Sequence, residues 1–181
     1  MARYNWIALL LGLSNIGLLF SCGLINELTN QWGFVFFFPA VLLFPSFLFL
    51  DKLRALLVLF ISGLYCDQAL SSSFGYHAFA LCFLYLLLSE FFPVGQKKSL
   101  LRPVSIQVVT HFLLALGWFL FLKFSKDGSN DWAFFRFLSD TILSGLLLFP
   151  VFQWYPRFCE ALIQLVGANS LRESFIEQNG E

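Results

Sequence analysis

Charge is scarce in this sequence: charged residues make up 12% of its 181 residues, with 11 Lys and Arg balanced by 11 Asp and Glu. A formal net charge of zero argues against the basic surface that nucleic-acid binding requires. Hydrophobic residues make up 59%, and the mean hydropathy is +0.77. A soluble domain of this size could not cover so much apolar surface with polar groups. The composition therefore predicts a membrane protein.

Signatures of catalysis and of metal binding are also missing. The sequence contains no Walker loop, no GxSxG and no HExxH, so we expect neither an enzyme nor a cofactor. His77 and His111 are lone histidines; for His111 an interhelical hydrogen bond is favoured over a proton relay. The cysteines form no CxxC pair and have no histidine at ligand spacing, which predicts small apolar helix residues: Cys22, Cys66, Cys82 and Cys159.

Long uncharged runs are what the sequence has instead. Each run could cross the hydrocarbon core of a bilayer, roughly 30 Å thick, as a helix. The clearest are Tyr4–Asn26, Leu28–Leu50, Gln68–Ser89 and Pro103–Leu122. Together with the shorter runs they predict an all-α integral membrane protein with six crossings, at residues 6–24, 34–50, 53–70, 76–93, 104–123 and 135–156. Residues 1–156 then form one transmembrane domain, because the connections are too short for a soluble one.

The positive charges predict the orientation. With the N-terminus inside, the cytoplasmic side holds Arg3, Lys52, Arg54, Lys97, Lys98, Arg102, Arg157 and Arg172, whereas the outer side holds Lys123, Lys126 and Arg136. Both termini are therefore expected in the cytoplasm. Residues 157–181 form a short cytoplasmic tail, for which an amphipathic helix is one prediction. A cleavable leader is the alternative for the first run, with Leu19–Cys22 loosely like a lipoprotein site, but Phe20 fits that pattern poorly.

Four acids lie in or beside the apolar runs. Asp51 lies next to basic residues at the inner boundary, and Glu90 can extend toward the same surface. Asp140 follows Arg136 by four residues, which predicts an ion pair on one helix face. Asp67 has no such partner, and at 1.5 Å per residue it lies roughly 20 Å above the start of its helix, within the outer third of the membrane.

Asp67 therefore needs hydrogen-bond donors from nearby. The candidates are the amides that begin the next helix, together with Gln68 and the hydroxyls of Ser71, Ser72 and Ser73. Gly63, one helical turn before Asp67, permits close approach of a neighbouring helix. Gly75 permits the positive φ of a tight turn.

A catalytic carboxylate pair made of Asp67 and Asp140 is the alternative interpretation. Both acids lie on the outer side, and two carboxyl groups can share a proton. Asp67, however, follows Tyr65 and Cys66 with no adjacent glycine, and Asp140 already has Arg136. The structural interpretation is favoured.

The spacing Gly63-x-x-x-Asp67, with Gly75 eight residues later and then Ala78, resembles the MreD family of bacterial rod shape-determining proteins. Small size, about six helices and the basic turn at Asp51–Arg54 agree with it. So do Gly145 and Pro150 in the last helix, followed by a basic end at Arg157. His77 and the acidic tail are not features expected of that family.

The resemblance implies a non-enzymatic scaffold in the bacterial inner membrane. MreD-like proteins are thought to bind the membrane-anchored MreC and so connect MreB filaments to the peptidoglycan synthases. Their fold is similar to that of the S components of energy-coupling factor transporters, which supplies the rival prediction of a vitamin or small-solute carrier. Polar residues of the first outer loop, Glu27, Asn30, Gln31 and Trp32, would serve such a carrier.

Overall fold

The computed structural model describes residues 2–36, 38–70, 74–89, 101–124 and 132–165, and in these ranges every regular element is helical. Side chains at several helix ends, including that of Arg136, lie outside the described part. The elements in chain order are α1 (Ala2–Asn30), the 3-10 turn η1 (Pro39–Leu42), α2 (Leu43–Phe49), α3 (Lys52–Ala69), α4 (Tyr76–Leu88), α5 (Leu101–Phe124) and α6 (Trp132–Leu165).

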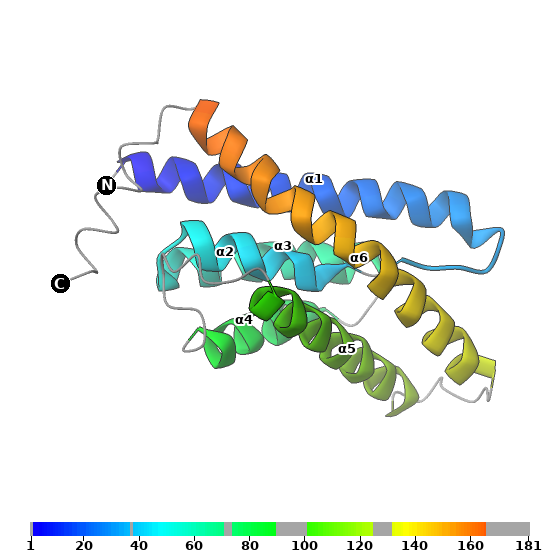
Figure 1. Cartoon of the computed structure of the whole chain (residues 1–181). Helices are drawn as coiled ribbons and strands as arrows, with labels where there is room; N and C mark the ends of the chain where they lie inside the picture. The colour runs from blue at the N-terminus through cyan, green and yellow to red at the C-terminus, as the bar shows by residue number, and fades with distance from the viewer. Residues whose placement is uncertain (1, 37, 71–73, 90–100, 125–131, 166–181) are drawn as a thin grey trace.

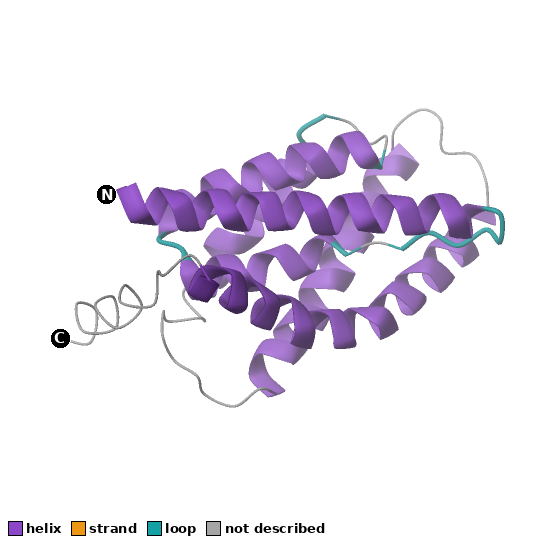
Figure 2. Cartoon of the chain, turned by 90° about the horizontal axis from the view of Figure 1, so that it is seen from above, coloured by secondary structure: helices purple, strands orange, loops and turns teal. Residues whose placement is uncertain are grey.

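The longer helices run back and forth along one bundle axis. α3 and α4 form an antiparallel pair with the most extensive contact among the described elements, and α1 packs along α3. α6 crosses α1 at an angle and runs beside α5 in the opposite direction (Figure 1). The start of α1 and the end of α6 lie at the same end of the bundle, as an even number of passages requires. Short loops connect the helices where the connections are described (Figure 2).

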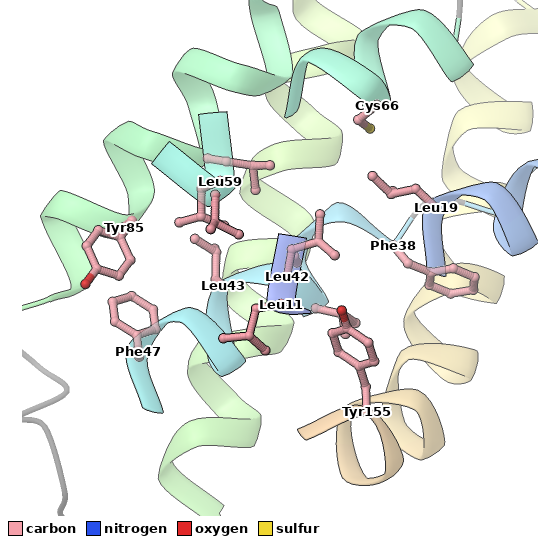
Figure 3. Packing of buried hydrophobic residues seen from close by; sticks show 14 of the residues in the cluster. Leu11, Leu19, Phe38, Leu42, Leu43, Phe47, Leu59, Cys66, Tyr85 and Tyr155 are labelled. Atoms are coloured by element: carbon pink, nitrogen blue, oxygen red, sulfur yellow. The ribbon is translucent and has the colours of Figure 1, made fainter. Parts of the chain in front are cut away.

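The centre of the bundle is built around η1 and α2. Ala40, Val41 and Leu42 are completely buried, and Leu43 is nearly so. Figure 3 shows Leu42 and Leu43 among side chains from the surrounding helices, including Leu11 of α1 and Leu59 of α3. The Phe47 ring stacks on Tyr85 of α4 with 4.6 Å between ring centroids. This segment is the one that all the other helices enclose.

The prediction of a continuous second helix over residues 34–50 is wrong at its beginning. Residues 34–36 and 38 are not helical, and the helical part begins at Pro39. Two causes act together. The residue before a proline is disfavoured in α conformation, and Phe38 precedes Pro39 at φ −122°. The side-chain amide of Asn26 also bonds both the N–H (2.6 Å) and the C=O (2.9 Å) of Phe36, which replaces the bonds of a helix.

The ends of the other helices differ from the predicted crossings by a few residues, with α6 as the exception. It continues through Pro156 to Leu165, so residues 157–165 belong to a helix that begins in the bundle. Residues 90–93 of the predicted fourth crossing and residues 166–181 of the predicted tail lie outside the described part.

Among the described residues, two helices are long and apolar enough to cross a membrane, over Asn5–Thr29 and Phe137–Leu165. Pro39–Phe49, Tyr76–Leu88 and Gln107–Phe121 are apolar but shorter. Large apolar side chains are exposed on all six α-helices, among them Phe79 at 71% and Leu146 at 68%. Such a surface is unusual for a soluble monomer and suggests membrane association.

Candidate functional site

The Asp67 carboxylate connects the end of α3 to the start of α4. Asp67 is 1% exposed. Its Oδ2 accepts a hydrogen bond from the Gly75 amide at 2.8 Å. Its Oδ1 accepts one from the His77 amide at 2.9 Å and lies 2.8 Å from Nδ1 of the His77 ring. Both oxygens of one acid therefore hold the backbone and a side chain of the next helix.

This geometry follows from the chemistry of a helix N-terminus. The first amides of an α-helix have no partner inside the helix, and they carry the positive end of its dipole. Gly75 is the N-cap residue of α4 and has no side chain that could accept from those amides. Asp67 supplies the acceptor from a different helix. The negative charge is therefore placed where the helix dipole stabilises it.

Gly75 has φ +95° and ψ −11°, a left-handed conformation that residues with a β-carbon rarely adopt. This is the positive φ expected for a tight turn at this glycine. The chain reverses here within a few residues, which brings the amides of Gly75 and His77 back onto Asp67.

Gly63 lies one helical turn before Asp67, where α3 passes close to the backbone at the start of α4. A β-carbon on Gly63 would lie 2.8 Å from the carbonyl carbon of His77 and closer still to the backbone of Ala78. Ala78 is completely buried. Close helix approach was the role expected of Gly63, and Ala78 is the residue that approaches it.

His77 is the site residue that sequence reasoning left without a role. Its side chain is fully buried. Because an ionised carboxylate only accepts hydrogen bonds, Nδ1 of the ring donates to Asp67. The Tyr76 ring lies 4.9 Å from the His77 ring and 5.1 Å from Phe121, and Trp118 lies 6.0 Å from His77. These contacts connect the start of α4 to α5. The sequence position of His77 could have indicated this role, because His77 is the second residue of the helix that Asp67 caps.

Of the donors predicted for Asp67, the amides that begin α4 are the ones found. Ser71, Ser72 and Ser73 lie outside the described residues. The side chain of Arg136, and with it the expected ion pair with Asp140, also lies outside them. Oδ1 of Asp140 accepts a hydrogen bond from the Val35 amide at 3.3 Å, which connects α6 to the non-helical segment.

A second polar contact, across α1, α3 and α6, was not predicted. Asn15 donates to Ser62 Oγ at 3.1 Å and accepts from the Tyr155 hydroxyl at 2.5 Å, and all three side chains are buried. Asn15 is a polar residue inside a long apolar run, which is the signal that could have revealed it.

Two hollows lie on either side of the connection between α3 and α4. One, of about 390 Å³, lies between α1 and α3, and Ile16, Ile61 and Gln68 are among its lining residues. The other, of about 580 Å³, lies between α4 and α5 and is lined mainly by aromatic rings, including Phe83 and Phe121. Phe74, 85% exposed, lines both hollows.

At this site the carboxylate oxygens of Asp67 already accept hydrogen bonds from the protein. Each oxygen of Asp67 is already bonded to the start of α4, and aromatic rings surround the imidazole of His77. Among the described residues, no three His, Cys, Asp or Glu side chains gather as a metal ion would require. Comparison of the chain with protein-family models, with curated proteins and with solved structures gives no significant match.

Proposed function

We propose that the chain is a multi-pass protein of the bacterial inner membrane in which all six helices of the bundle lie within the bilayer. The apolar surface spread over every helix supports this, because a bilayer is the solvent that would cover it. The buried part of the non-helical segment before Pro39 is compatible with it. Irregular backbone is tolerated at membrane depth only where protein buries it, and Phe36 and Phe38 are buried.

The proposed orientation places both termini in the cytoplasm. Arg54, at the start of α3, bonds Asn5 near the start of α1 at 3.3 Å and Asp51 at 2.7 Å, so these charges gather at one end of the bundle. The sequence assigns most of its basic residues to the side of Lys52 and Arg54, which favours this end as the cytoplasmic one. The Asp67 site then faces the outer leaflet.

We propose that this protein acts as a non-enzymatic scaffold similar to MreD. One observation carries the proposal. Gly63, Asp67, Gly75 and Ala78, the residues of the resemblance, all take part in a single junction between α3 and α4. The junction is built from a close backbone contact, a turn and a buried acid whose oxygens are occupied. Such residues maintain architecture, which is what a protein that works through helix–helix contacts needs.

The proposed partner is the membrane anchor of an MreC-like protein. Through it the scaffold would connect MreB-like filaments in the cytoplasm to the peptidoglycan synthases outside. A carrier of small solutes is the rival proposal. It is less favoured because Glu27, Gln31 and Trp32 line neither of the two hollows, whose walls are mainly apolar. A solute site offers several convergent polar groups.

The experiment is complementation in the bacterium that encodes this chain. We expect depletion of the protein to make the cells lose rod shape, and wild-type protein to restore it and to co-purify with the MreC-like partner. Asp67→Leu should fail in both assays, because it removes the acceptor for the amides of α4. Gln68→Leu, a change at the exposed neighbouring residue, is the matched control and should behave as wild type. Rod-shaped growth without the protein, or full function of Asp67→Leu, would contradict the proposal.

A further inference from the structure

Five buried polar side chains lie on the neighbouring helices α5 and α6, away from the Asp67 site. On α5 they are Gln107, Thr110 and His111, and on α6 they are Thr141 and Ser144. We call these five residues the α5–α6 seam. None is more than 5% exposed. Polar side chains buried at this depth in a membrane bundle are costly and mark functional sites or ion pathways. The scaffold function proposed above leaves this seam unexplained.

The register of the seam is fixed by one contact. Nε2 of His111 lies 3.3 Å from the carbonyl oxygen of Thr141. A β-carbon on Gly145 would lie 3.9 Å from Cδ2 of His111, so α6 passes close to the ring. Because α5 and α6 run in opposite directions, the residues one turn before His111 on α5 lie level with the residues one turn after Thr141 on α6. Gln107 is therefore level with the turn of α6 that contains Ser144.

The contact with Thr141 also fixes the tautomer of His111. A carbonyl oxygen only accepts hydrogen bonds, so Nε2 carries the proton in the neutral ring. Nδ1 is then the basic nitrogen, the atom to which a second proton would bind.

The side chain of Gln107 indicates that the seam contains water. Its side-chain nitrogen is buried and has no hydrogen-bond partner in the described part of the protein. A buried amide without a partner is costly, and bound water is the usual remedy. Gln107 and His111 are four residues apart on one helix, where side chains begin about 5–6 Å apart, a gap that one water molecule can bridge.

Few charged groups lie near the contact between His111 and Thr141 in the sequence. Asp140, next to Thr141 on α6, places its carboxylate on the same turn of that helix. η1 and α2, which pack beside α5 and α6, contain no titratable residue, and Gln107, Thr110 and Ser144 are neutral. Because burial disfavours the charged form of the His111 ring, a second proton there requires water or another polar group beside it.

We propose that the α5–α6 seam is a hydrated proton-binding site in which Gln107 holds water against His111. The proton passes from a hydronium in the seam to Nδ1 of His111, which leaves water behind and converts the neutral ring to imidazolium. This site is separate from the Asp67 junction, so it does not depend on the scaffold function.

The test uses the full chain, labelled with ¹⁵N-histidine and placed in lipid nanodiscs. The protein contains two histidines, and the ring signals that disappear in His111→Gln belong to His111. We expect the wild-type His111 ring to convert reversibly from the Nε2–H form to the doubly protonated form as the pH falls. We also expect its N–H protons to exchange magnetisation with water. Gln107→Leu should weaken proton binding by His111 about tenfold and remove the water signal.

The control is Val109→Leu, a change on the lipid-facing side of α5, which should leave the titration unchanged. Each variant is first checked by size-exclusion chromatography. The His77 signals, unchanged between wild type and Gln107→Leu, show that the bundle is intact. If the His111 ring stays neutral down to the pH at which the protein unfolds, the proposal is wrong. A midpoint that is the same in wild type and Gln107→Leu would also overturn it.

Discussion

Gly63 of α3 and Ala78 of α4 lie so close together that a β-carbon on Gly63 would overlap the backbone of Ala78. The two helices approach closely here, four residues before the acid that caps α4. A glycine at this position and an acid one turn later are therefore two parts of one junction.

Gly63→Ala should destabilise the protein by about 1–3 kcal/mol, because the added methyl group must push two backbones apart. The measurement is the fraction of protein that remains folded after heating in mild detergent, followed by fluorescence-detected size-exclusion chromatography. Gly12→Ala is the control, since a β-carbon there meets nothing within 4 Å. Equal melting of the two variants would show that the close approach is not needed.

Asp67→Asn should destabilise the junction by about 1–3 kcal/mol, and Asp67→Leu by more. The amide retains one accepting oxygen, so it can serve Gly75 or His77 but not both. The leucine leaves all of these donors without the acceptor. In thermal melting in detergent, we expect stability to decrease in the order wild type, Asp67→Asn, Asp67→Leu. A leucine variant as stable as the asparagine variant would contradict the hydrogen-bonding role of the carboxylate.

Gly75→Ala should cost about 1–2 kcal/mol, because φ at this position is +95° and a β-carbon is strained there. Gly75→Asn should cost less, since asparagine tolerates the left-handed region. The comparison needs the same melting assay, with Gly23→Ala as the control at a helical glycine that has open space around it. If alanine and asparagine at position 75 have the same effect, strain in φ is not the cause.

Tyr155→Phe should weaken the packing of α6 on α1 by about 0.6–1.7 kcal/mol, the range for hydrogen bonds between membrane helices. The lost hydroxyl donates to the buried Asn15. A double-mutant cycle with Asn15→Leu isolates the pair, and a coupling energy within experimental error of zero would refute the contact. Tyr65→Phe, at a partly exposed tyrosine of α3, serves as the control and should have little effect.

The proposed topology predicts which engineered cysteines are accessible from outside the cell. In a variant lacking the four native cysteines, Trp32→Cys should react with a membrane-impermeant maleimide in intact cells. Lys52→Cys, at the opposite end of the bundle, should react only after permeabilisation. Both positions are exposed, so the difference reports the side of the membrane. The reverse pattern would place the termini outside.

The sequence by itself determined those features that depend on short segments of chain. Apolar runs interrupted by charge located the helices, because hydrophobic length requires no knowledge of neighbours. The spacing of Gly63, Asp67 and Gly75 predicted a close approach, a buried acid and a tight turn, since all three follow from local geometry. The free amides at the start of the next helix were correctly named as donors to Asp67 for the same reason.

The tertiary structure decided what joins segments that are distant in the chain. The second helix was predicted too long because its first residues bond to Asn26 of α1, an interaction that the hydropathy of residues 34–50 does not encode. Tyr155 and Asn15 are 140 positions apart, and His111 meets the backbone of Thr141 only because α5 and α6 pack side by side. Composition specifies that such polar groups must find partners in an apolar environment, whereas the packing of the helices selects which partners they find.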